Sequence, residues 1–119
     1  MDDLKDIVFT YKEHTGYIKI NRPPNNFFDS DLIRQIADVL EEMDKKQDCR
    51  SIILYSEGKH FCAGADFSRS NFKNESDAYS ALYDQAVRLF RTSKPIIAVI
   101  QGAAVGGGLG VALAADFRI

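Results

Sequence analysis

Glycine is dense in the run from Gly102 to Gly110 (GAAVGGGLG), and its surroundings indicate chemistry carried out by the backbone. The run follows Pro95–Gln101, whose β-branched residues are typical of a buried strand, and leads into a small-residue helix expected over Leu109–Ala115. The first N–H groups of a helix have no partner inside it, and glycine lets other atoms approach closely. Such a turn can hold an anion or a developing oxyanion. Alternatively, the glycines only let helix and strand pack closely, and this run alone does not decide.

A run earlier in the chain has similar features, and we call it the first run and Gly102–Gly110 the second run. From Lys59 to Asp66 (KHFCAGAD), small residues surround one glycine, and this first run follows an apolar strand expected at Ser51–Ser56. Two such strand ends can together form one site, which favours the functional interpretation of the second run.

The elements that must position these runs alternate between strand and helix. This order predicts an α/β fold with parallel strands joined by right-handed crossovers. A β-hairpin is expected first, with strands Ile7–Tyr11 and Tyr17–Asn21 and its turn at Gly16. The later elements are expected as a helix at Asp31–Lys46, the strand Ser51–Ser56, a helix at Glu75–Arg91, the strand Pro95–Gln101, the helix Leu109–Ala115 and a strand beginning at Phe117.

The first helix is strongly amphipathic. Its apolar residues recur at helical spacing, and Asp29 or Ser30 is placed to cap its first turn. The opposite face is charged, and we interpret it as a solvated surface rather than a binding patch. Its charged residues are Arg34, Asp38, Glu41, Glu42, Lys45 and Lys46.

Composition limits the class of protein. The chain has 119 residues, 45% hydrophobic and 27% charged, with a formal net charge of -2, which predicts one globular core and gives no reason to expect nucleic acid or a membrane as partner. No apolar run is long enough to span a membrane, and the first residues lack a secretory signal, so a cytoplasmic location is expected. The cysteines, Cys49 and Cys62, form no metal-binding pattern and are expected to be free thiols.

Four segments together resemble the crotonase superfamily, the enoyl-CoA hydratase/isomerase family. The two central ones are Phe61–Asp66 and Gly102–Gly110, and Ile20–Asn26 and Ala114–Ile119 fit the same pattern. The resemblance runs from about Ile7 to the end of the chain. It implies an α/β, crotonase-like fold of repeated ββα units wound as a spiral, with residues 1–119 as a single domain that forms the N-terminal part of it. It also implies an acyl-CoA substrate, no cofactor apart from the coenzyme A of that substrate, and a homotrimer or hexamer for the full-length protein.

The resemblance assigns an oxyanion hole to two backbone groups. Matched position by position, the two N–H donors that stabilise the thioester enolate fall on Ala65 and Gly107. Backbone donors at a helix N-terminus are preorganised and need no titratable side chain, and one such donor contributes about 10²–10³-fold in rate.

Further positions are implied in coenzyme A and substrate binding. Ala63 to Phe67 match the family segment that lies along the coenzyme A moiety, with the backbone near Ala63 at the adenine. Asp66 is interpreted as closing this loop through backbone N–H groups rather than transferring protons. Phe27 and Phe28 stand where the family often has Ala-Leu, so the acyl or pantetheine channel is expected to differ here.

Gly110 departs from the hydratase pattern. In the hydratases this position carries one of two glutamates that handle the attacking water, and glycine can neither take nor return a proton. A two-glutamate hydration mechanism is therefore disfavoured, whereas family reactions that use a later carboxylate, including isomerisation and dehalogenation, remain open. Gly110 is retained as a substrate-binding position.

No other residue clearly replaces the missing carboxylate. His60 and Cys62 lie near the first oxyanion donor, but side chains alternate along a strand and no histidine is placed to activate the thiol. Glu57 and His14 are interpreted as a loop charge and an exposed hairpin tip. A non-catalytic module that binds CoA thioesters or partner subunits remains the alternative. A nucleotide-binding unit is disfavoured because the glycine spacing fits neither a Rossmann motif nor a P-loop.

Overall fold

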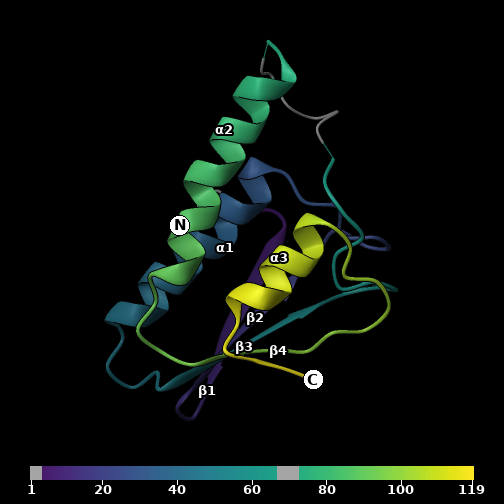
Figure 1. Ribbon diagram of the computed structural model, residues 1–119. Coiled ribbons are helices and arrows are strands. Elements are labelled where there is room, and N and C mark those ends of the chain that lie inside the picture. Colours follow the sequence, from purple (N-terminus) through teal and green to yellow (C-terminus); the bar gives the residue numbers. More distant parts are fainter. Residues whose placement is uncertain (1–3, 67–72) are drawn as a thin grey trace.

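The computed structural model describes residues 4–66 and 73–119. Its elements follow the expected alternation of strand and helix (Figure 1). In order they are β1 (Ile7–Lys12), β2 (Thr15–Ile20), α1 (Ser30–Lys45), β3 (Ser51–Ser56), α2 (Glu75–Ala86), the 3₁₀ helix η1 (Val87–Phe90), β4 (Ile96–Ala98), α3 (Gly107–Ala114) and β5 (Phe117–Arg118).

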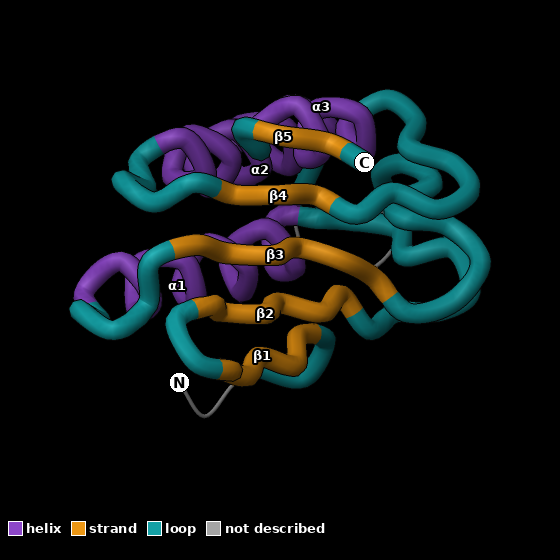
Figure 2. Tube along the Cα trace, turned by 90° about the horizontal axis from the view of Figure 1, so that it is seen from below, coloured by secondary structure: helices purple, strands orange, loops and turns teal. Residues whose placement is uncertain are grey.

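The strands form one sheet in the order β1-β2-β3-β4-β5 (Figure 2). The β1–β2 pair is antiparallel and the later pairs are parallel. All three α-helices lie on the same face of the sheet (Figures 1 and 2). Residues of β2 and β3 alternate between buried and half-buried, as expected for strands with helices on one face only. The predicted α/β class with parallel crossovers is confirmed.

The hairpin turn is not where the sequence predicted it. Lys12 pairs with Thr15, so the turn consists of Glu13 and His14, and Glu13 takes a positive φ of 57°. Gly16 lies inside β2 instead. A Cβ atom there would come within 2.7 Å of the Met43 sulfur, so this glycine lets helix α1 pack directly on the strand.

Helix α1 starts as predicted. The Asp29 side chain caps it by accepting a hydrogen bond of 2.9 Å from the Leu32 N–H. Its apolar residues Ile33, Ile36, Val39 and Met43 are buried against the sheet and form a large part of the core. Within the described ranges, no helix combines the length and apolar character needed to cross a bilayer.

The later elements differ from expectation at their ends. The helix predicted over 75–91 is divided, because α2 ends at Ala86 and the chain tightens into η1. The regular strand predicted over 95–101 is limited to Ile96–Ala98, although the N–H groups of Val99 and Ile100 still donate to Leu54 and Ile119. Helix α3 begins at Gly107, two residues earlier than predicted. The last two differences leave residues 99–106 as the loop that carries the first glycines of the run.

Candidate functional site

The two glycine-containing runs lie side by side. The Phe61 N–H donates to the Gln101 carbonyl at 2.8 Å, and the Cys62 N–H donates to the Ala103 carbonyl at 3.1 Å. The Val105 N–H returns a bond of 3.1 Å to the Cys62 carbonyl. Cys62 and Ala104 therefore form a parallel bridge beyond the end of the regular sheet. The two strand ends are therefore direct neighbours, as a shared site would require.

Two glycines of the second run make this approach possible. A Cβ atom on Gly108 would lie 2.2 Å from the Cys62 carbonyl oxygen, and one on Gly102 would lie 2.3 Å from the Lys59 carbonyl oxygen. Real side chains do not tolerate such contacts with backbone. The packing explanation of the run is thus correct for these two positions, and it fixes the first turn of α3 against residues 59–62.

The Ala65 N–H points away from its neighbouring strand segment. Phe28 bridges Ala65 by donating its N–H to the Gly64 carbonyl at 2.9 Å and accepting from the Asp66 N–H at 2.8 Å. In a trans peptide the C=O and N–H point in opposite directions, so the N–H that follows the Gly64 carbonyl is directed away from Phe28. Among the hydrogen bonds of the described residues, none uses the Ala65 N–H.

The N–H of Gly107 lies at the start of α3. Gly106 precedes it with φ 56° and ψ -119°, and no side chain caps this helix end. The Gly108 N–H donates to the Val105 carbonyl at 2.8 Å, and the Gly110 N–H donates to the Gly106 carbonyl at 3.2 Å. Gly107 is the first residue of α3, and the first N–H groups of a helix have no acceptor inside it.

A large apolar cavity of about 700 Å³ adjoins both segments. Its walls come from four places: Gly64 and Ala65, the start of α3 with the loop before it, one face of α2 and η1, and the pair Phe28 and Ile33 at and near the start of α1. The lining residues of α2 and η1 are Tyr79, Leu82, Tyr83, Ala86, Val87, Leu89 and Phe90. Such a space is of the size and character that binds a small apolar group.

Gly110 faces this cavity. A Cβ atom built on it would have nothing within 4 Å, so the absence of a side chain here leaves open space. Among the described lining residues, none carries a carboxylate, an imidazole or an amine. Among its described lining residues, this cavity therefore offers no carboxylate for proton transfer.

The other predicted site residues lie elsewhere. Phe27 and Asp66 line a separate hollow of about 160 Å³, next to Arg22 and Pro23. Ala63 does not line either space, and its N–H donates to the Asn25 carbonyl at 2.9 Å. Phe67 falls outside the described residues. Ala65 and Gly110 thus share the large cavity, whereas Phe27 and Asp66 share the small one.

The four side chains considered as alternative proton-transfer groups lie away from the large cavity. The His60 Nδ1 accepts the Ala103 N–H at 2.8 Å. Burial raises the pKa of the Cys62 thiol, so it stays protonated and is a poor nucleophile. Glu57 pairs with Lys19 at 3.4 Å, and His14 is in the exposed hairpin turn near the Asp48 carbonyl. Among the residues that line the large cavity, none of these four appears.

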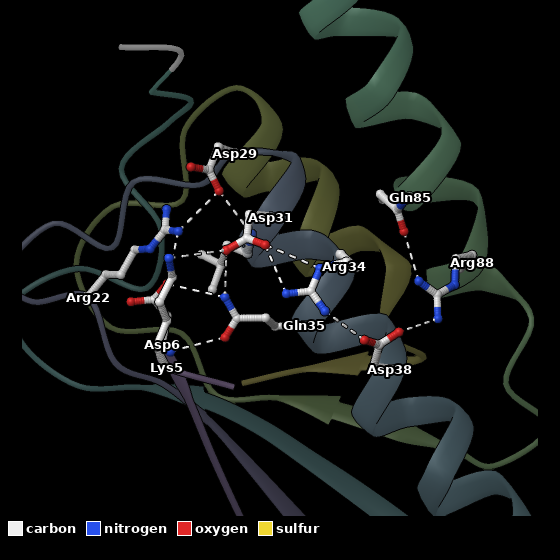
Figure 3. A network of polar contacts seen from close by, with 11 residues as sticks. Lys5, Asp6, Arg22, Asp29, Asp31, Arg34, Gln35, Asp38, Gln85 and Arg88 are labelled. Carbon is white, nitrogen blue, oxygen red and sulfur yellow. Dashed lines mark hydrogen bonds and ion pairs between the residues drawn. The ribbon is translucent and has the colours of Figure 1, made fainter. Parts of the chain in front are cut away.

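Sequence reasoning missed Arg22 as a positioning residue. Its side chain is only 8% exposed, and its guanidinium lies 3.0 Å from Asp6 and 3.1 Å from Asp29 (Figure 3). It also donates to the Phe27 carbonyl at 3.1 Å. These bonds hold the loop whose next residue, Phe28, bridges Ala65. The signal in the sequence is an arginine before two prolines in Ile20–Asn26.

Ion pairs join α1 to η1, and they use charged groups of the α1 face that we predicted to be solvated. Arg88 donates through Nη2 to Asp38 at 2.6 Å and, through Nε and Nη2, to both carboxylate oxygens of Glu41 (Figure 3 shows the Asp38 contact). The bidentate contact holds the pKa of Glu41 below its usual range. This arrangement fixes the α2 and η1 wall of the cavity to α1.

Comparison with known proteins agrees with this geometry. The family model for enoyl-CoA hydratase/isomerase matches residues 10–119. The chain is 38% identical over 119 residues to YngF of Bacillus subtilis, which is named for that enzyme class, covering 95% of this chain and 46% of YngF. It is 35% identical to the (E)-benzylidenesuccinyl-CoA hydratase of Thauera aromatica, over 95% of this chain and 46% of that protein.

A solved structure extends the likeness to the fold. The enoyl-CoA hydratase/isomerase (crotonase) of Legionella pneumophila superposes with a TM-score of 0.83 at 34% identity, covering 98% of this chain and 48% of that one. The chain therefore belongs to the enoyl-CoA hydratase/isomerase family and has the crotonase fold, as the resemblance implied. It spans about half the length of the curated relatives it matches.

Proposed function

We propose that this chain supplies the oxyanion-binding part of an enzyme that acts on acyl-CoA thioesters. The backbone N–H groups of Ala65 and Gly107 bind the thioester carbonyl oxygen in this proposal. The observation that carries it is the pairing of residues 61–62 with residues 101–105, which brings Gly64–Ala65 and the start of α3 to the same apolar cavity.

These donors act on the charge that develops when a proton leaves the carbon next to the carbonyl. The resulting enolate places negative charge on the thioester oxygen, and fixed N–H dipoles stabilise it more than they stabilise the neutral substrate. Both donors belong to segments held by backbone hydrogen bonds, so little reorganisation is needed as the charge forms. The apolar lining favours an uncharged acyl group.

The proton-transfer carboxylate in this proposal comes from outside residues 1–119, which would form the N-terminal part of a single crotonase-like domain. Gly110 offers open space instead of a glutamate. Reactions that need one carboxylate, such as isomerisation, therefore agree better with this site than hydration by two glutamates.

The second candidate is a module that binds CoA thioesters without converting them. The absence of acidic and basic side chains among the described residues of the cavity favours it. It predicts that an enoyl-CoA binds and is recovered with unchanged mass and double-bond position.

The deciding experiment uses the full-length protein with Gly107→Pro and Gly107→Ala. Proline is accepted at the first position of a helix but removes the N–H, whereas alanine keeps it. We expect Gly107→Pro to lower turnover of an enoyl-CoA by about 10²-fold or more, with Gly107→Ala much less affected. Calorimetric titration and mass analysis of the thioester provide the readouts. Normal turnover in a folded Gly107→Pro variant would refute the assignment of this donor.

Assembly and compartment are part of the same proposal. We expect the full-length protein to form a homotrimer or a hexamer built from two trimers, to reside in the cytoplasm and to need no cofactor beyond the coenzyme A of its substrate. Light scattering after size-exclusion chromatography measures the first expectation. A monomer that turns over enoyl-CoA would contradict it.

A further inference from the structure

His60 is hydrogen-bonded to the glycine-rich loop through its side chain. The Ala103 N–H donates to the His60 Nδ1 at 2.8 Å. Since a backbone N–H can only donate, Nδ1 must be the unprotonated nitrogen, and the neutral ring carries its proton on Nε2. The imidazole is therefore a fixed acceptor in this structure rather than a base directed at the cavity.

The backbone of His60 is itself tightly held. Its carbonyl accepts a bond of 2.7 Å from the side chain of Asn26, which is fully buried, and a bond of 3.3 Å from the Ser56 hydroxyl. Its N–H donates to the Pro24 carbonyl at 3.2 Å. A rigid backbone gives the ring a defined position from which to hold the loop.

The loop in turn leaves little room beside the ring. A Cβ atom on Gly102 would lie 2.5 Å from the His60 Nδ1. Gly102 has a φ of 59°, and this turn directs the next N–H, that of Ala103, at the ring. Gly102 thus allows the loop to approach the ring, and His60 accepts the hydrogen bond from the Ala103 N–H.

Ala103 is held from both sides by the first run. Its N–H is bound by the His60 side chain, and its carbonyl accepts the Cys62 N–H at 3.1 Å. Val105 then donates to the Cys62 carbonyl, and the chain passes through Gly106 into α3. The other hydrogen bonds between residues 61–62 and residues 101–105 join backbone atoms only. The His60 ring adds a side-chain acceptor to this set of bonds.

We propose that His60 is a positioning residue for the oxyanion hole, acting through Ala103 to set where the Gly107 N–H lies relative to Ala65. This inference rests on the proposed function for its catalytic consequence. It assigns His60 no proton transfer and no contact with substrate. A displacement of about 1 Å in a catalytic group can cost on the order of 10²-fold in rate, so loss of this bond is expected to lower kcat.

The test compares three variants of the full-length protein with an enoyl-CoA. His60→Ala removes the acceptor. His60→Asn keeps an acceptor, because the side-chain oxygen of asparagine can occupy nearly the place of Nδ1. His14→Asn is the matched control, since it alters the other histidine of this chain, in the exposed hairpin turn.

We expect His60→Ala to lose roughly 10–100-fold in kcat with KM changed little, because the cavity wall remains while the donor is displaced. His60→Asn should recover most of the rate, and His14→Asn should match the unaltered protein. Full kcat in His60→Ala would overturn the proposal. Equal losses in His60→Ala and His60→Asn would also overturn it, because they would indicate packing of the ring rather than its acceptor.

A spectroscopic measurement makes the test independent of folding of the variants. In the unaltered protein labelled with ¹⁵N, the Ala103 N–H and the His60 Nδ1 should show a scalar coupling across their hydrogen bond. A proton found on Nδ1 would overturn the proposal. If the unaltered protein neither binds nor converts the thioester while this coupling is present, the proposed function fails, and the His60 contact is then shown to be structural only.

Discussion

The two walls of the large cavity are held in place by different forces. Helix α3 packs on the first run through backbone atoms, because the Cys62 carbonyl lies directly beside Gly108. The opposite wall, formed by α2 and η1, is joined to α1 by the Arg88 guanidinium, which binds the carboxylates of Asp38 and Glu41. One contact is steric and the other is electrostatic.

This difference matches what each wall must do. Steric contact between backbone atoms fixes a position to within a few tenths of an ångström and does not depend on pH or salt. Exposed or half-exposed ion pairs are screened by salt and allow more movement. The wall that carries the proposed Gly107 donor is the sterically fixed one. The wall that would contact the acyl group is held by these charges together with the apolar packing of Leu82 and Leu89.

The largest expected effect comes from Gly108→Ala. The added methyl group would meet the Cys62 carbonyl at 2.2 Å, so α3 must move away from the first run. We expect unfolding to become easier by roughly 3 kcal/mol, because overpacking against backbone exceeds the small gain in helix propensity. Denaturant unfolding followed by circular dichroism measures it. An unchanged midpoint would show that α3 is not fixed by this contact.

Gly106→Ala should have the next largest effect, for a different reason. A Cβ atom here has nothing within 4 Å, but the φ of 56° is one that L side chains rarely adopt. We expect a loss of about 2 kcal/mol from backbone strain alone. The same unfolding measurement applies, and a loss equal to that of Gly108→Ala would mean that space and strain are not separable in this run.

Much of this arrangement could be predicted from the sequence. The alternation of strands and helices, the Asp29 cap and the neighbourhood of the two glycine runs all depend on local patterns that the sequence displays directly. Packing explains two glycines of Gly102–Gly110, whereas the functional explanation stays a prediction for the others. Gly102 and Gly108 pack against the first run, whereas Gly106 and Gly110 line the open cavity or lead into it.

The missed features depend on contacts between segments far apart in the chain. Arg88 and Glu41 are separated by 47 positions, so no local pattern shows that a surface charge on α1 is paired. The sequence predicts the turn at Gly16 because glycine favours turns. In the fold, a glycine is needed at this position because Met43 packs where a side chain would lie. The acceptor role of His60 likewise required the position of Ala103, which only the folded loop provides.

Arg88→Met tests the electrostatic wall. Methionine keeps an apolar stem but removes the bonds to Asp38 and Glu41. We expect a loss of about 1 kcal/mol at neutral pH, discounted because the Glu41 side chain is 48% exposed. Added salt should reduce the difference from the unaltered protein, whereas it should leave the effect of Gly108→Ala unchanged.

The Arg88–Glu41 pair also makes the stability of this wall depend on pH. The hydrogen bond from Arg88 lowers the pKa of Glu41, so the folded state binds this proton less readily than the unfolded state. The stabilisation is therefore present above the ordinary glutamate range and is lost as the pH falls through the lowered value. The stability difference between Arg88→Met and the unaltered protein should shrink as the pH falls through the ordinary glutamate range and below it. A constant difference would contradict this origin.

The smallest expected effect is that of Gly110→Ala, and its sign is the informative part. Gly110 lies two residues after Gly108 in the same helix, but its Cβ direction is open. Alanine loses less backbone freedom than glycine on folding, so we expect a gain of roughly 0.5 kcal/mol. A gain here beside a large loss at Gly108 would show that one helix uses glycine for two purposes, close approach on one side and empty cavity on the other. A loss at Gly110 would mean that this side of α3 also packs closely, and the division between the two sides would then be wrong.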